Sequence, residues 1–120
     1  MIAALLVALV DDDESVRESL PDLLRELGYE ARAFDSAEAF LADDVSMSDA
    51  GCLILDVVMP GMSGPDLHAE LLRRGRTIPT LFISALPGLA LPSGPKVASL
   101  RKPFSEQELR GALAKLLPGA

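Results

Sequence analysis

Thiol and imidazole side chains are nearly absent from this 120-residue chain. It contains one cysteine, Cys52, one histidine, and no tryptophan. A lone cysteine excludes an internal disulfide and a cysteine-based zinc site, and it suits a reducing compartment, so we expect a cytoplasmic protein. Cys52 is best interpreted as a small residue of the hydrophobic core.

Positive charge is also scarce. The chain has 11 lysines and arginines against 18 aspartates and glutamates, which gives a net charge of −7. Such a surface repels a polyanion, so we expect no direct contact with nucleic acid. Hydrophobic residues make up 49% of the chain and charged residues 24%. This balance is typical of a soluble globular protein, and the length fits a single domain over residues 1–120.

The apolar N-terminal stretch "MIAALLVALV" is too short to cross a bilayer. It also lacks the basic residues and the small-residue cleavage site of a signal peptide. We therefore expect it to form a buried strand, lengthened at its start, and we expect no membrane association.

Apolar runs alternate with amphipathic segments along the chain, which predicts βαβ units and a parallel sheet. The expected strands are residues 5–10, 29–34, 52–56, 78–84 and 96–102. Helices are expected over residues 14–28, 36–42 and 64–75, and a last one opens at Ser105 with a capping box to Glu108. We interpret residues 43–50, "DDVSMSDA", as a polar loop.

One segment interrupts this alternation. Residues 85–95, "ALPGLALPSGP", contain three prolines and two glycines. Proline removes a helical hydrogen bond and glycine weakens a helix, so we expect a loop or one short turn there rather than a full amphipathic helix. We expect the helix between the fourth and fifth strands to be shortened or absent, and the segment to be a mobile or partner-ordered loop.

Carboxylates stand at the ends of two predicted central strands: Asp11 and Asp12 after the first, and Asp56 at the end of "CLILD". The carboxyl ends of parallel strands meet at one edge of a sheet, where the fourth strand would bring Ser84 and the fifth Lys102. Clustered carboxylates repel one another unless a cation intervenes. A hard cation with oxygen ligands, Mg²⁺, fits this set.

A carboxylate beside Mg²⁺ can act as a nucleophile toward phosphorus and form an aspartyl phosphate. Phosphoryl transfer needs positioning and neutralisation of the charge on the phosphoryl oxygens. The Lys102 ammonium and the Ser84 hydroxyl supply groups of the right kind for two of those oxygens, and Mg²⁺ for the third.

Four motifs in order, "VDDDESVR", "LILDVVMPGMSG", Ser84 and "RKPF", resemble the receiver domain of bacterial two-component response regulators. "DSAEAFLA" is similar to the receivers of nitrogen-fixation-type transcriptional regulators. The resemblance implies a flavodoxin-like, doubly wound five-stranded parallel α/β sheet of order 2-1-3-4-5. It also implies a cis bond between Lys102 and Pro103.

The same resemblance implies the roles of the site residues. Asp56 is the phosphoacceptor, while Ser84 and Lys102 serve the transferred group. Asp12 binds Mg²⁺ directly and Asp11 mainly through water. The backbone carbonyl of Val58 completes the protein ligands.

The implied partners are a sensor histidine kinase or a histidine phosphotransferase, and an unknown output protein. A weak homodimer is compatible with the family. Such a chain is a phosphoacceptor switch that catalyses only its own phosphorylation and dephosphorylation, rather than a metabolic enzyme. No output domain is expected after the last helix. The sequence leaves open whether the chain is a stand-alone regulator or an excised receiver.

Two features depart from the family pattern. Ser99 stands where receivers usually carry a tyrosine or phenylalanine that rotates inward on activation, and the interval from Ser84 to Lys102 is several residues short. These departures keep an alternative open, a pseudo-receiver that binds partners without phosphorylation. An aspartyl-phosphate hydrolase would need an acid at Val58, and a flavin module would need an uncharged phosphate loop in place of "DDDES". His68 is expected to be an ordinary helical residue.

Overall fold

Five parallel strands form the centre of the protein in the computed structural model, which describes residues 4–117. Their spatial order is β2-β1-β3-β4-β5, so the predicted order 2-1-3-4-5 is confirmed. Residues 1–3, expected to lengthen the first strand, lie outside the described residues. The strands are β1 (Leu6–Val10), β2 (Glu30–Phe34), β3 (Ala50–Asp56), β4 (Thr80–Ser84) and β5 (Val97–Arg101).

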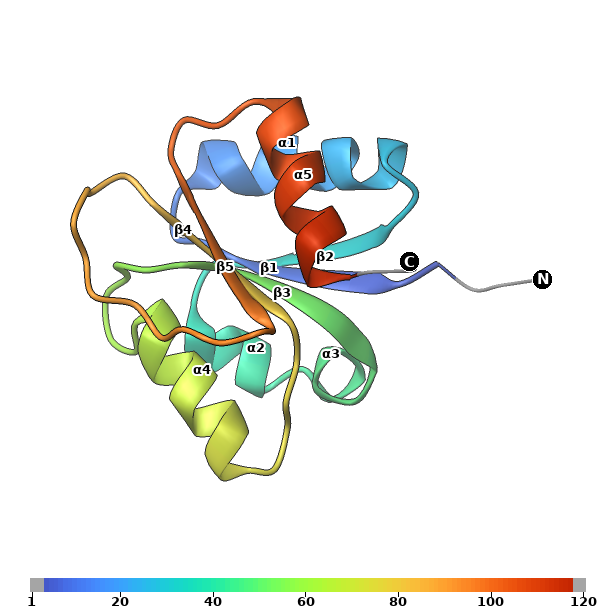
Figure 1. The fold of residues 1–120 in the computed structure, drawn as a ribbon. Coiled ribbons are helices and arrows are strands. Elements are labelled where there is room, and N and C mark those ends of the chain that lie inside the picture. The colour runs from blue at the N-terminus through green and yellow to red at the C-terminus, as the bar shows by residue number, and fades with distance from the viewer. Residues whose placement is uncertain (1–3, 118–120) are drawn as a thin grey trace.

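Helices cover both faces of the sheet (Figure 1). Two of them, α1 (Glu14–Glu26) and α5 (Glu106–Leu116), lie on one face. The opposite face carries α2 (Ala37–Leu41), α3 (Asp44–Asp49) and α4 (Gly64–Arg73). None of the helices in the described part of the chain is both long and apolar enough to cross a membrane.

Two hydrophobic cores, one on each face, hold the layers together. Leu24 of α1 and Leu109 of α5 are fully buried against Ile54 of β3 in the first core. Phe40 of α2 and Leu67 of α4 are fully buried in the second. Strands β1 and β4 are buried at every position, as expected for strands covered on both faces. The edge strand β2 is mostly exposed, as its alternating sequence predicts.

The ends of the helices follow local hydrogen-bonding rules. Asp13 caps α1 by accepting a hydrogen bond from the Ser15 amide. The predicted capping box of α5 is confirmed, since Ser105 and Glu108 each accept a hydrogen bond from the other's backbone amide. These caps fix where each helix starts relative to the strand end before it.

The prediction of a polar loop over residues 43–50 is wrong, because the structure places helix α3 there. Asp43 caps this helix through the Ser46 amide, and Ser46 is fully buried. Met47 packs against the second core. A six-residue helix has little intrinsic stability, so its formation depends on packing that a local pattern of polar residues does not reveal.

No helix forms between β4 and β5, where every residue is described. The prediction that the fourth helix of the fold is shortened or absent is therefore confirmed. The chain passes from Ser84 to Val97 through bends, turns and irregular backbone. The cis bond between Lys102 and Pro103 is present as well.

Candidate functional site

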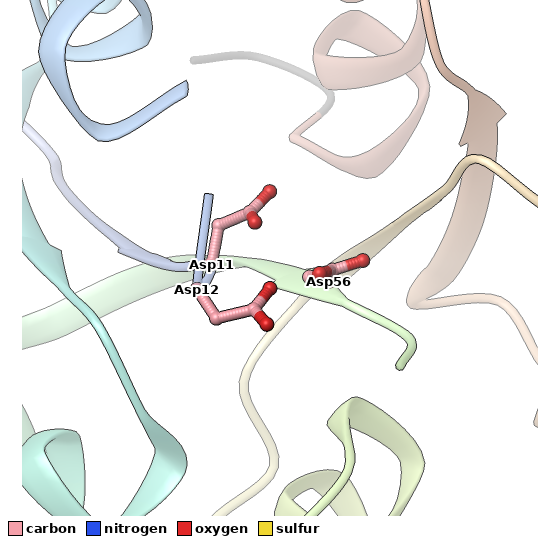
Figure 2. A group of neighbouring side chains, drawn as sticks. All are labelled: Asp11, Asp12 and Asp56. Carbon is pink, nitrogen blue, oxygen red and sulfur yellow. The ribbon is translucent and has the colours of Figure 1, made fainter. Parts of the chain in front are cut away.

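Three carboxylates meet where β1 and β3 end. Asp56 is the last residue of β3, and Asp11 and Asp12 follow β1 directly. The register pairs Val10 with Leu55, which places the next residue of each strand side by side. One carboxylate oxygen from each of the three aspartates lies within 4.8 Å of the others. Figure 2 shows the three side chains gathered at this sheet edge.

The three carboxylates differ in their surroundings. Asp11 is fully buried, Asp56 is 7% exposed, and Asp12 is open to solvent. The Asp11 carboxylate accepts a hydrogen bond of 2.9 Å from the Asp13 amide, which fixes its orientation. The site therefore has a rigid inner part and one carboxylate on its solvent side.

Lys102 brings a positive charge into this cluster. Its ammonium nitrogen lies 2.7 Å from Asp11 Oδ2 and 3.6 Å from Asp56 Oδ1. Asp11 Oδ2 has no partner in good hydrogen-bond geometry within residues 4–117, so the contact with Lys102 is an ion pair off the hydrogen-bond angle. Burial lowers the pKa of Lys102, but the close contact with the Asp11 carboxylate and the negative charges of Asp11 and Asp56 outweigh it and raise the pKa overall. Lys102 is therefore a cation in the site.

The surroundings of Asp56 disfavour its ionised form. Burial, as the main cause, and the negative charge of Asp11 together raise the pKa of Asp56 from 3.8 to about 7. Lys102 opposes the increase without cancelling it. A second cation at the open side, beside Asp12, would lower this pKa, because a nearby positive charge favours the ionised carboxylate.

Ser84 ends β4, the neighbour of β3, and is 8% exposed. Its hydroxyl donates to the Leu86 carbonyl at 3.1 Å and accepts from the Leu86 amide at 3.0 Å. The Ser84 carbonyl accepts from the Lys102 amide at 2.8 Å. The structure thus places Ser84 at the same sheet edge as Asp56, with its hydroxyl bonded to the loop that follows β4.

Val58 lies two residues after Asp56, in the loop of residues 57–63 that joins β3 to α4, and its side chain is 55% exposed. The other predicted residues thus stand around the ends of β1, β3, β4 and β5, and Val58 stands just beyond β3. Ser99, in the place of the usual aromatic, is exposed on β5.

The sequence analysis missed two residues that support the site. Gly64 begins α4 against the end of β3, where an added Cβ would lie 2.3 Å from the Asp56 carbonyl oxygen. Arg17 of α1 donates a hydrogen bond of 2.9 Å to the Asp11 carbonyl. The "SG" that ends "LILDVVMPGMSG" was a signal for Gly64, since a glycine at a helix start can mark a close backbone approach. Arg17 stood in "VDDDESVR" without a local pattern that revealed its partner.

Residues 7–114 match the sequence model of the response regulator receiver domain. This chain belongs to that family. It is 42% identical over 119 residues to the response regulator protein TodT of Pseudomonas putida, a match that covers 95% of this chain and 52% of TodT. The transcriptional regulatory protein FixJ of Azorhizobium caulinodans is 47% identical over 75 residues, 62% of this chain and 35% of FixJ. The receiver thus spans about half the length of TodT.

Solved structures of receivers superpose on this fold. The response regulator StyR has a TM-score of 0.84 and 41% identity, over 96% of this receiver and 60% of the StyR chain. The response regulator TrrA of Thermotoga maritima, solved in complex with Mg²⁺ and BeF, has a TM-score of 0.79 and 28% identity, over 94% of this receiver and 99% of TrrA. The match with FixJ, a transcriptional regulatory protein, agrees with the predicted resemblance to the receivers of transcriptional regulators.

Proposed function

We propose that Asp56 accepts a phosphoryl group from a sensor histidine kinase or a histidine phosphotransferase in a Mg²⁺-dependent reaction. The observation that carries this proposal is the close approach of one cation to a cluster of three carboxylates, Asp11, Asp12 and Asp56. The Lys102 ammonium contacts two of them, Asp11 and Asp56. A purely structural ion pair would need one carboxylate, whereas this arrangement leaves negative charge that one lysine does not neutralise. The membership of the receiver family supports the same reading.

In this reaction an Asp56 carboxylate oxygen attacks the phosphorus of a phosphohistidine. A new O–P bond forms, the N–P bond of the donor breaks, and the released imidazole nitrogen keeps the bonding electron pair and takes up a proton from water. Hydrolysis later returns the phosphoryl group to water as inorganic phosphate. The receiver therefore promotes its own modification and its own reset, and has no metabolic substrate.

The donor set suits Mg²⁺, which prefers oxygen ligands and retains several waters. Asp11, Asp12 and Asp56 would hold the ion with the Val58 backbone carbonyl, Asp12 directly and Asp11 mainly through water. Their clustered oxygens and the open side at Asp12 fit such an ion. TrrA, solved with Mg²⁺ and BeF, supports this assignment by analogy. When bound, Mg²⁺ supplies positive charge that favours ionised Asp56 and a more anionic phosphoryl group.

Lys102 and Ser84 would serve the phosphoryl group once it is on Asp56. The ammonium, already 3.6 Å from Asp56 Oδ1, provides one positive contact. The Ser84 hydroxyl can donate to a second phosphoryl oxygen only after its hydrogen bond to the Leu86 carbonyl is broken. Phosphorylation would thereby change the loop between β4 and β5, and with it the binding of an output partner.

We interpret residues 1–120 as one such receiver domain in the cytoplasm. Its output partner is a protein rather than nucleic acid, because the net charge is −7. A weak homodimer is compatible with this function.

Intact mass after incubation with phosphoramidate or acetyl phosphate tests the proposal. We expect a gain of one phosphoryl group that requires Mg²⁺ and disappears in Asp56→Asn. Lys102→Ala should reduce the gain without abolishing Mg²⁺ binding. No gain in the wild-type protein under any condition would reject the proposal and leave the alternative, a pseudo-receiver that binds partners without phosphorylation.

A further inference from the structure

The loop of residues 57–63 carries Val58 and is held firmly at its two ends. At its start the Val57 amide donates to Ile83 of β4, and the Val57 carbonyl accepts from Gly64. At its end Ser63 and Asp66 form a capping box at the start of α4. The middle of the loop has Met59 buried in the second core, but side-chain packing alone does not fix the direction of a backbone carbonyl.

Glu38 of α2 supplies the missing backbone contact. Its Oε2 accepts a hydrogen bond of 3.2 Å from the Met62 amide, across 24 positions of sequence. This is the one hydrogen bond recorded to the backbone of residues 58–62 from the described part of the chain.

The backbone at Gly61 gives independent evidence of this approach. Its φ is +76°, and an added Cβ would lie 3.0 Å from Glu38 Oε2. A side chain at position 61 would thus be disfavoured both by the backbone conformation and by the Glu38 carboxylate. The loop and the carboxylate fit against each other.

Besides its place in the first turn of α2, Glu38 makes no ion pair and does not cap its helix. Its side chain is exposed, and no lysine or arginine within residues 4–117 lies in ion-pair distance of it. The cap of α2 is made by Ser36, which accepts from Ala39. The hydrogen bond to Met62 is therefore the contact that distinguishes Glu38 from other surface glutamates.

We propose that Glu38 is a positioning residue for Mg²⁺ binding, because it holds the loop that presents the Val58 carbonyl to the acidic site. This inference rests on the proposed function in taking Val58 as a ligand. Glu38 does not touch the ion. It restricts the backbone conformation of the loop that contains Val58, two residues after Asp56.

A rival explanation is that Glu38 attracts Mg²⁺ through its charge. The two explanations differ in Glu38→Gln, which keeps a carbonyl oxygen for the Met62 amide but removes the charge. Glu106→Ala is the matched control, since Glu106 is an exposed glutamate in the first turn of α5 and the substitution also removes one negative charge. Glu106 pairs with Arg110 at 3.7 Å, but both side chains are exposed, so the loss of this ion pair has little effect. It controls for the loss of a favourable charge at a helix start.

The test measures three quantities on each variant of the 120-residue chain: the ¹⁵N and ¹H shifts of the Met62 amide without Mg²⁺, the Kd for Mg²⁺ by titration of amide resonances, and the thermal unfolding midpoint. A hydrogen bond of this kind is worth about a 3- to 10-fold change in an equilibrium. We therefore expect Glu38→Ala to move the Met62 resonance and to raise the Kd by about 3- to 10-fold. Glu38→Gln and Glu106→Ala should stay within about twofold of the wild type.

Equal Kd values for Glu38→Ala and the wild type would overturn the inference. So would a Glu38→Gln Kd as high as that of Glu38→Ala, because charge alone would then explain the effect. Phosphorylation of the wild type by phosphoramidate separates this failure from failure of the proposed function. If the wild type is phosphorylated but Glu38→Ala leaves the Kd for Mg²⁺ unchanged, only the positioning role is rejected. If the wild type neither binds Mg²⁺ nor is phosphorylated, both the positioning role and the proposed function are rejected.

Discussion

At the scale of single residues, Asp56 combines burial with a charge. The unfolded chain ionises this carboxyl near its ordinary pKa of 3.8, whereas the folded protein raises the pKa to about 7. Between these values the unfolded chain has released a proton that the folded protein still holds. Folding stability contributed by this group is therefore full below pH 3.8 and is lost as pH rises toward 7.

Asp56→Asn should consequently stabilise the protein in the absence of divalent cations. The gain should be small near pH 4 and grow to the order of 2 to 4 kcal/mol above pH 7, because the variant has no carboxyl to ionise. Thermal or urea unfolding in EDTA between pH 4 and pH 8 measures it. A gain that is the same at every pH would contradict this account, and saturating Mg²⁺ should narrow the gap at neutral pH.

Cys52 gives a second prediction at this scale. The residue is fully buried in β3, and burial raises the pKa of its thiol to about 12. The reactive species is the thiolate, so the native protein should resist alkylation by iodoacetamide at pH 8. In urea the same thiol should react at the rate of a free cysteine. Rapid labelling of the native protein would show that β3 opens readily.

At the scale of elements, Gly64 joins β3 to α4 at very short range. Gly64→Ala should destabilise the fold by about 1 to 3 kcal/mol, because a Cβ would meet the Asp56 carbonyl and force backbone to move. Gly111→Ala in α5 is the matched control, since its added Cβ would meet nothing within 4 Å. That change should stabilise by about 0.5 to 1 kcal/mol. Urea unfolding measures the free energy of unfolding of both variants. Equal changes in the two variants would contradict the close approach of Gly64 to the Asp56 carbonyl.

The segment between β4 and β5 gives the other prediction for an element. From residue 87 to residue 93 no backbone amide has a recorded hydrogen-bond partner in the described chain. Amides there should exchange with deuterium close to the rate of an unstructured peptide, while those of β4 stay protected. Slow exchange throughout residues 87–93 in the free protein would show that the segment is ordered without a partner.

The sequence predicted helices and strands well where hydrophobic periodicity was strong, and it failed where tertiary packing determines whether a helix forms. Strands such as β1 and β4 were recognisable because burial on both faces requires continuous apolar residues. Helix α3 was missed because most of its residues are polar. Its stability depends on the burial of Ser46 and on the packing of Met47 against the second core. The absent helix between β4 and β5 was predictable because prolines exclude it locally.

At the scale of the whole molecule, the site could be predicted in part. Residues at strand ends, such as Asp11, Asp56 and Lys102, come together through parallel topology, which the sequence pattern indicates. Their distances and burial required the folded chain. The roles of Arg17 and Glu38 could not be predicted. Arg17 contacts the Asp11 carbonyl and Glu38 contacts the Met62 amide, and these contacts depend on how separate segments of the chain pack in the folded protein. Sequence thus indicated the reactive groups more readily than the residues that hold them in place.

If Asp56 is phosphorylated as proposed, the paired hydrogen bonds between Ser84 and Leu86 would make phosphorylation and partner binding reciprocal. One hydroxyl proton cannot serve both the Leu86 carbonyl and a phosphoryl oxygen, so the two states of Ser84 exclude each other. A partner that prefers the loop with Leu86 released would shift the phosphorylation equilibrium by the same factor by which phosphorylation tightens its binding. The occupancy of Asp56 would then report the abundance of the output partner as well as the activity of the kinase.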